Sequence, residues 1–408
     1  MPNRPSDPSG LSRRQLLLGG AVAGAGAVGA LATDQLITNP NAQVAAAQPL
    51  NGDATVPFFG MHQSGIDTAP AAHAVLIALD LRDEVERAEL RSMMRLLSDD
   101  AARLTQGLSP LADSEPELSF VPAQLTVTFG FGPEFVRRAG GDPGTHSWLH
   151  PLPAFGVDRL EPAWNDGDLL IQVCSDDQLT VAHTIRMLLK DARKFATHRW
   201  TQRGFRRAYG SEKTGTTMRN LFGQVDGTTN PALGSAELAQ AVWVNDGSWL
   251  TAGTGMVIRR IRMDVDKWDR LDRPGRELAV GRRLDTGAPL TGTAERDVPD
   301  FEATTAIGFP TIPEFSHIRR SSPATPGEVI FRRSYNYDDT PPDPEAISNT
   351  GLVFISFQAD IDRQFVPIQT RLDELDLLNE WTTPIGSAVF AVPPGCSEGG
   401  YVGETLLT

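Results

Sequence analysis

Apolar and polar positions along the first half of the chain predict a β-α-β-β-α-β order of elements. Short runs with apolar alternation are typical of strands, and apolar residues three or four apart indicate helices. Strands are expected over residues 74–81, 124–131, 168–174 and 198–205, and helices over 84–104 and 180–195.

The same order is predicted to recur in the second half. Strands are expected over residues 255–263, 329–333, 352–357 and 387–392, and helices over 265–271 and 372–380. The repetition is one of element order, because the residues themselves show no clear repeat. Two such units predict an α+β fold of antiparallel sheets with helices on their outer faces.

A segment before the first strand is predicted to be an export signal and linker. Arg13 and Arg14 precede a Gly/Ala-rich apolar run over residues 16–32, which is short and weakly hydrophobic for a membrane span. Cleavage patterns of small residues follow at 30–32 and 45–47. A twin-arginine pattern is an export address, so we expect export by the twin-arginine machinery to the periplasm or the cell exterior. An uncleaved anchor is the alternative.

The length and net charge of the chain limit its domain organisation and its classes of function. Residues 1–47 are assigned to the signal and linker, residues 57–222 to an N-terminal module, and residues 223–408 to a C-terminal module. The hydrophobic share of 40% supports an ordinary soluble core, and no stable membrane insertion is expected. The net charge of -14 argues against nucleic-acid binding, which requires a positive surface.

Several familiar sites are absent from the sequence. The two cysteines, Cys174 and Cys396, do not make a disulfide framework, and Cys174 lies in an apolar run typical of a buried strand. No CxxCH, GxxxxGK[ST] or HExxH pattern occurs. Their absence excludes a covalent c-type haem attachment, a P-loop and a zincin centre.

The segment 223–231, Gly-Gln-Val-Asp-Gly-Thr-Thr-Asn-Pro, is the first candidate site. It places the carboxylate of Asp226 between Gly223 and Gly227, and glycines permit tight turns and close approach to a flat ligand. A pocket could tune the proton affinity of such a carboxylate. The alternative is a surface turn, because Gly, Asp, Asn and Pro all favour turns.

Two further segments carry candidate chemistry. His317 lies in a Pro-rich connection before a pair of arginines, where it could ligate a metal through one ring nitrogen or simply occupy a surface loop. Strand alternation puts Arg332 and Arg333 on opposite faces, so that one of them could point into a cavity and the other to solvent. The alternative is a solvated pair at the end of a strand.

Together these segments resemble the dye-decolorizing peroxidases, a family of b-type haem enzymes, over essentially the whole mature chain. The matching segments are the GxxDG motif at 223–227 with its extension to 231, and the stretches 316–319, 330–335, 277–283 and 286–292. The resemblance implies two ferredoxin-like modules of the dimeric α+β barrel type. It also implies haem b (iron protoporphyrin IX) as cofactor, and it leaves a homodimer open.

The resemblance also implies roles for individual residues. His317 would ligate the iron, Asp226 would shuttle a proton, and Arg332 would stabilise charge as the O–O bond breaks. Arg282 would pair with a haem propionate. A shift of one residue in the alignment with the family would give the role of Arg332 to Arg333 instead. The other cofactor-binding residues implied are Gly227, Thr228, Thr229, Ser334 in the distal pocket, and Phe354 as an apolar wall.

The activity implied is a peroxidase that uses hydrogen peroxide to oxidise bulky aromatic reductants such as dyes, phenols and lignin-like compounds, by way of a ferryl intermediate. Electrons from large substrates would pass through oxidisable side chains, for which Trp268, Tyr335, Tyr337 and Trp381 are candidates, although buried aromatics usually serve as core. One alternative is an exported haem-handling or iron-release protein, similar to a deferrochelatase. Another is a secreted binding module.

Overall fold

The computed structural model describes residues 50–341 and 344–408, so the predicted signal and linker over residues 1–47 lie outside the described residues. The first half contains β1 (His73–Leu81), α2 (Arg87–Thr105), β2 (Thr126–Phe131), α3 (Pro133–Arg138), β3 (Leu169–Ser175), α4 (Gln178–Ala192) and β4 (Ala196–Phe205). These elements confirm the predicted order, with the short helix α3 in addition.

The second half is built from more and shorter elements. It contains α5 (Ala236–Val242), β5 (Thr254–Met263), α6 (Val265–Trp268), α7 (Arg273–Val280), α8 (His317–Ser321), β6 (Phe331–Arg332), β7 (Tyr335–Asp339), β8 (Asn349–Gln358), α9 (Ile361–Leu375), β9 (Thr382–Val392) and α10 (Glu404–Leu407).

Each half forms a four-stranded antiparallel sheet of the same topology. The strand order is β2-β3-β1-β4 in the first half and β7-β8-β5-β9 in the second. When the strands of each half are counted along the chain, leaving out the two-residue strand β6, the second strand pairs with the third, the third with the first, and the first with the fourth. This is the ferredoxin-like order, and the predicted α+β fold of two such modules is confirmed.

The two sheets join into one closed barrel. Strand β2 meets β9 at Phe131 and Ala391, and β4 meets β7 at Phe205 and Asn336. Each junction rests on a single residue pair, whereas β5 pairs with β8 along eight residues and with β9 along ten. The halves are therefore joined mainly by side chains packed inside and around the barrel.

Strand alternation divides the core into two layers. Small and apolar side chains of β1 and β3, including Ala74, Leu76, Ala78 and Cys174, fill the barrel together with Phe357 of β8. The alternate residues face outward, where those of the first half lie beneath α2 and α4. Both cysteines are free and buried.

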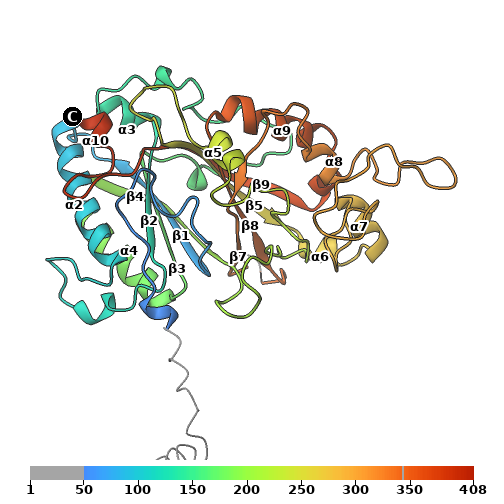
Figure 1. Cartoon of the computed structure of the whole chain (residues 1–408), viewed down its shortest axis with the longest axis horizontal. Coiled ribbons are helices and arrows are strands. Elements are labelled where there is room, and N and C mark those ends of the chain that lie inside the picture. Colours follow the sequence, from blue (N-terminus) through green and yellow to red (C-terminus); the bar gives the residue numbers. More distant parts are fainter. Residues whose placement is uncertain (1–49, 342–343) are drawn as a thin grey trace, which may run out of the picture. The chain divides into compact units, whose positions relative to one another are not determined.

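Helices cover the outer faces of the two sheets. Figure 1 shows α2 and α4 flanking the strands of the first half, and α8 and α9 flanking those of the second. The side chain of Asp177 accepts a hydrogen bond from Thr180 N at the start of α4, and Asp360 accepts one from Arg363 N at the start of α9. No helix in the part of the chain described is long and apolar enough to cross a bilayer.

Two predicted elements of the second half were wrong in their bounds. The helix expected over 372–380 is α9, which begins at Ile361 and ends at Leu375, and a 3₁₀ turn follows over Leu377–Glu380. The internal Pro367 obscures this helix in the sequence, because proline normally breaks helices. The strand expected over 329–333 is reduced to the two residues of β6.

A buried pair of carboxyl groups lies between the helices of the first half. Burial, a hydrogen bond to Asp191 of α4 and its charge raise the pKa of Asp100 in α2 to about 8. Burial also raises the pKa of Asp191. The other charges that act on the pair are Asp99 and Arg103 on the side of α2 and Lys190 and Arg193 on the side of α4. The native pair therefore holds a proton at neutral pH.

We expect the stability of the protein to fall as the pH rises from about 4 to about 8. In this window the native state holds a proton that the unfolded state has lost, so the free energy of unfolding falls by up to about 1.4 kcal/mol per pH unit. Asp100→Asn should flatten this dependence, since its amide still donates to Asp191. Urea unfolding at four pH values measures the slope. Asp83→Asn, at an exposed position and not among the charges named for the pair, is the control, and equal slopes in all three proteins would contradict the prediction.

Candidate functional site

A cavity of ≈ 370 Å³ lies between the sheet of the second half and the helices that cover it. Residues Ile261 of β5 and Phe354 of β8 line it from the sheet, and Phe365 and Ile368 line it from α9. Its volume falls within the range of small-molecule and cofactor sites. The charged side chains that the sequence singled out line the same cavity.

The glycines of the GxxDG motif allow the turn that presents Asp226. Gly223 and Gly227 have φ angles of 78° and 119°, in the region that favours glycine. Between them Val225 forms a β-bridge with Arg219, and Asp226 N donates to Met218 O at 2.8 Å. The motif is thus a structured turn with its carboxylate at the cavity.

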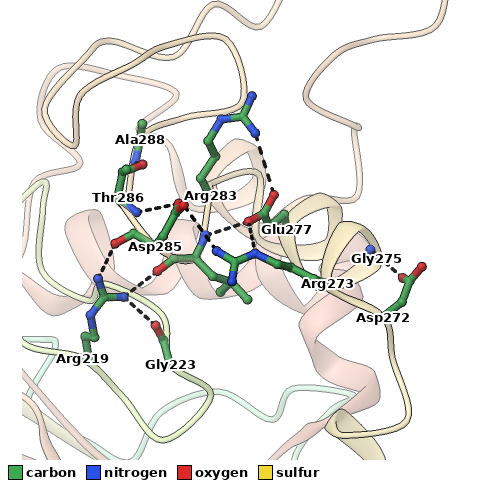
Figure 2. Close-up of polar contacts among 11 residues, drawn as sticks. Arg219, Gly223, Asp272, Arg273, Gly275, Glu277, Arg283, Asp285, Thr286 and Ala288 are labelled. Carbon is green, nitrogen blue, oxygen red and sulfur yellow. Dashed lines mark hydrogen bonds and ion pairs between the residues drawn. The ribbon is translucent and has the colours of Figure 1, made fainter.

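Arg219 ties this turn to the connection that follows α7. Its guanidinium donates to the carbonyl oxygen of Gly223 at 2.8 Å and to those of Leu284 and Asp285 at 2.6 Å each (Figure 2). Glu277 of α7 accepts a hydrogen bond from Leu284 N at 3.1 Å, which holds the same connection from its other side. The position of the motif is therefore fixed relative to Arg282 nearby.

Asp226 and Arg332 form an ion pair at the polar end of the cavity. Nη1 of Arg332 lies 3.1 Å from Oδ1 of Asp226, and their side chains are 23% and 13% exposed. Asn230 aligns the two segments, because its Nδ2 donates to Arg332 O at 2.6 Å and its Oδ1 accepts from Arg332 N at 3.0 Å. Arg332 also reaches Thr229 Oγ1 at 3.5 Å.

Arg333 does not line this cavity, as strand alternation predicts, but the expectation that it points to solvent was wrong. It is buried, and its guanidinium donates to the carbonyl oxygens of Ile66, Thr68 and Ala69 in the first half. Of the two arginines, the structure brings Arg332 to the cavity and gives Arg333 a structural position.

His317 is the first residue of α8, not a loop residue as the sequence indicated. Its Nδ1 lies 2.6 Å from Oδ2 of Asp376, which follows α9 and is buried. Burial alone would lower the pKa of His317, but the charge of Asp376 and its hydrogen bond together outweigh burial and raise that pKa. Because Nδ1 donates to the carboxylate, Nε2 is the ring nitrogen left for a metal.

Arg282 supplies a second cation to the cavity wall. It is buried, and its Nη1 donates to the carbonyl oxygens of Gly287 and Glu295 at 2.7 Å each. Burial lowers its pKa, although the charge of Glu295 opposes this shift. The Glu295 carboxylate also accepts from Thr228 Oγ1 at 3.0 Å.

Most of the site residues predicted from the sequence share this one cavity. Those that line it are Asp226, Gly227, Thr228, Thr229, Arg282, His317, Arg332 and Phe354. Ser334 is buried beside Arg206, which donates to its carbonyl oxygen, and it is not among the lining residues. Sequence reasoning missed Asn230, which the extended motif contained, and Asp376, which nothing in the sequence links to His317.

The aromatic candidates for electron transfer are all buried. Trp268 stacks on Phe222 of the cavity wall with ring centroids 4.5 Å apart, and Trp381 meets Trp268 edge to face at 5.2 Å. Trp381 in turn lines a second cavity of ≈ 250 Å³. Tyr335 and Tyr337 point into the barrel.

Comparisons with known proteins match both halves of the chain. Residues 63–206 match the model of the N-terminal part of Dyp-type peroxidases, and residues 217–397 match that of the C-terminal part. A dye-decolorizing peroxidase of Thermobifida fusca is 35% identical, with 98% of both chains covered. A deferrochelatase of Escherichia coli is 33% identical, with 97% of both covered.

Solved structures of related proteins also have a similar fold. A DyP-type peroxidase from Cellulomonas bogoriensis has a TM-score of 0.85 at 53% identity, covering 88% of this chain and 99% of its own. Ferric DtpA from Streptomyces lividans has a TM-score of 0.84 at 38% identity, covering 88% of this chain and 100% of its own. Two matched family models and these relatives show that the chain belongs to the dye-decolorizing peroxidases and is an enzyme of that family.

Proposed function

We propose that haem b occupies the cavity behind His317 and that the enzyme uses hydrogen peroxide to oxidise bulky aromatic reductants. The observation that carries this proposal is the convergence of His317, Asp226 and Arg332 on one cavity from three separate segments. The cofactor is haem b, in keeping with solved relatives named as ferric or as complexes with heme.

The residues present fit an iron porphyrin. His317 offers one ring nitrogen while Asp376 holds the other, which is a common arrangement for a metal-ligating histidine. The cation of Arg282 suits a propionate, and the apolar walls from Phe354 and Ile261 suit the faces of a flat macrocycle. When bound, the haem supplies an iron that activates peroxide and exchanges single electrons with reductants.

The polar end of the cavity would manage protons and charge. The carboxylate of Asp226 accepts a proton from hydrogen peroxide and returns it to the leaving oxygen, which becomes water. The fixed positive charge of Arg332 stabilises negative charge on that oxygen and holds Asp226 in place through their ion pair. Asn230 fixes the distance between the two segments.

Asp226→Asn and Arg332→Ala should each slow the reaction with peroxide by about 100-fold or more, because one loses the proton acceptor and the other the charge. Stopped-flow spectra of the haem protein after mixing with one equivalent of peroxide measure the rate. A rate unchanged in both variants would remove the proposed roles.

Arg333→Ala is the matched control for this experiment. It removes a neighbouring arginine that bonds backbone carbonyls away from the cavity, so it should destabilise the fold and leave the peroxide rate of the folded protein unchanged.

Haem handling is the second candidate function, because relatives of nearly equal similarity are named deferrochelatases. An iron-releasing protein would convert bound haem to metal-free protoporphyrin, which fluoresces. Fluorescent porphyrin without steady-state oxidation of a phenol would favour this function. Phenol oxidation without porphyrin release would favour the peroxidase.

Substrates too large for the cavity would donate electrons through Trp268 and Trp381, which connect the cavity wall at Phe222 with the second cavity. Trp381→Phe should lower turnover of a sulfonated anthraquinone dye about tenfold, since phenylalanine is harder to oxidise, and spare that of a small phenol. Steady-state rates with both reductants test this. Trp243→Phe, at a tryptophan stacked on His62, is the control, and an equal loss in both variants would contradict the route.

The place of action follows from the twin-arginine pattern at Arg13 and Arg14. We expect the protein to leave the cytoplasm through the twin-arginine machinery. A homodimer also stays a prediction. N-terminal sequencing of protein from the periplasm or medium should show cleavage near residues 30–47. Cytoplasmic protein with an intact Met1 would contradict export.

A further inference from the structure

One wall of the haem cavity comes from the opposite half of the molecule. Among the described residues that line the cavity, Val157 alone precedes residue 206 and so belongs to the first half. It lies in the segment 155–158, part of the long connection between α3 and β3, and we call this segment the strap. The strap therefore bounds a cavity whose other walls come from residues after 219.

Asp373 of α9 holds the middle of the strap through its backbone. The carboxylate accepts a hydrogen bond from Gly156 N at 2.9 Å and another from Val157 N at 2.8 Å. Hydrogen bonds to an ionised acceptor are stronger than neutral ones, and the paired geometry fixes the strap against the helix. Asp373 is itself only partly buried.

A buried ion pair holds the end of the strap. Asp158 pairs with Arg259 of β5, and their side chains are 8% and 1% exposed. The guanidinium of Arg259 lies over the ring of Phe155, with 5.6 Å from Cζ to the ring centroid. Breaking such a pair leaves an uncompensated charge in a buried position, so this end is firmly attached.

Both ends of the strap are attached. Phe155 is buried against Arg259, and Asp158 N donates to Phe155 O at 3.2 Å, which closes the strap into a turn. Beyond it, Arg159 N donates to Pro384 O and Glu161 N donates to Ile385 O, both at 2.9 Å, which fastens the chain to β9. Release of the contact to Asp373 would therefore free the tip of the turn, Gly156 and Val157, while both of its ends stay anchored.

We propose that the strap gates the exchange of haem, with Asp373 as its latch. The proposal rests on the proposed placement of haem in this cavity. With the latch closed, Val157 covers the cavity and haem is retained. With the latch open, the wall on that side separates without unfolding of the sheet or of α9. Asp373 is thus a positioning residue that acts through the strap.

Transfer of haem to an excess of apomyoglobin tests the gate in the holoprotein. The three atoms nearest to a Cβ atom at Gly156 would be Oδ1, Oδ2 and Cγ of Asp373, at 3.4, 3.5 and 3.8 Å, so cysteines at the two positions would face each other and are the pair to join by a disulfide. Both native cysteines are buried and free. The reduced and oxidised forms of this double variant are an open and a locked latch in the same protein.

We expect the reduced form to lose haem about tenfold faster than the wild type, and the oxidised form to lose it several times more slowly. Asp373→Asn, which replaces one acceptor by a donor, should also accelerate the loss about tenfold. The wild type with the same reductant controls for the reductant itself. Equal transfer rates in the two redox forms, or an unchanged rate in Asp373→Asn, would overturn the proposal.

His317→Ala separates this inference from the proposed site. If that variant keeps haem with an unchanged spectrum and transfer rate, then haem is not held in the cavity, and the proposed function fails together with the gate. If His317→Ala loses haem readily but the redox state of the latch has no effect, the site stands and the gate alone is wrong.

Discussion

The last turn of α9 is the point on which the arrangement of the site depends. Three side chains within six residues reach in different directions: Arg371 donates to the carbonyl oxygens of Arg320 and Ser322 at the end of α8, Asp373 accepts from the strap, and Asp376 accepts from His317. One helix thereby sets the position of the histidine, of the helix that carries it and of the cavity wall. The apolar residues of α9 pack toward the sheet, so the packing of the core determines where this helix and its three side chains lie.

The charged end of the cavity obeys a different constraint. Isolated charges are costly to bury, so Asp226 and Arg332 are paired, and Arg282 is satisfied by two carbonyl oxygens. Each arrangement leaves part of the group free to meet a ligand. The glycines of the motif bring the backbone close enough for this, and Asn230 keeps the two segments in register through paired hydrogen bonds.

Local signals explain what the sequence predicted well. Strand alternation separated Arg332 from Arg333, and the glycines beside Asp226 indicated a turn with positive φ. Long-range contacts explain what it missed, since Asp376 lies 59 residues from His317 and no pattern marks the pair. The predicted role of Ser334 followed from its neighbours in sequence, whereas in the structure this residue is buried and does not line the cavity.

The two halves share a topology but use their outer faces differently. In the first half, α2 and α4 cover the sheet completely, and Met93, Met94 and Leu97 fill the space between them with no exposure. In the second half, the connection from β5 to β7 is broken into α6, α7, α8 and long loops, so α9 is the only long helix on that face among the residues that the structure describes. A single helix and several short ones cannot fill the space above the sheet, and the cavity is what remains. The same strand order therefore yields a packed core in one half and, in the other, a hollow lined by the residues of the candidate site.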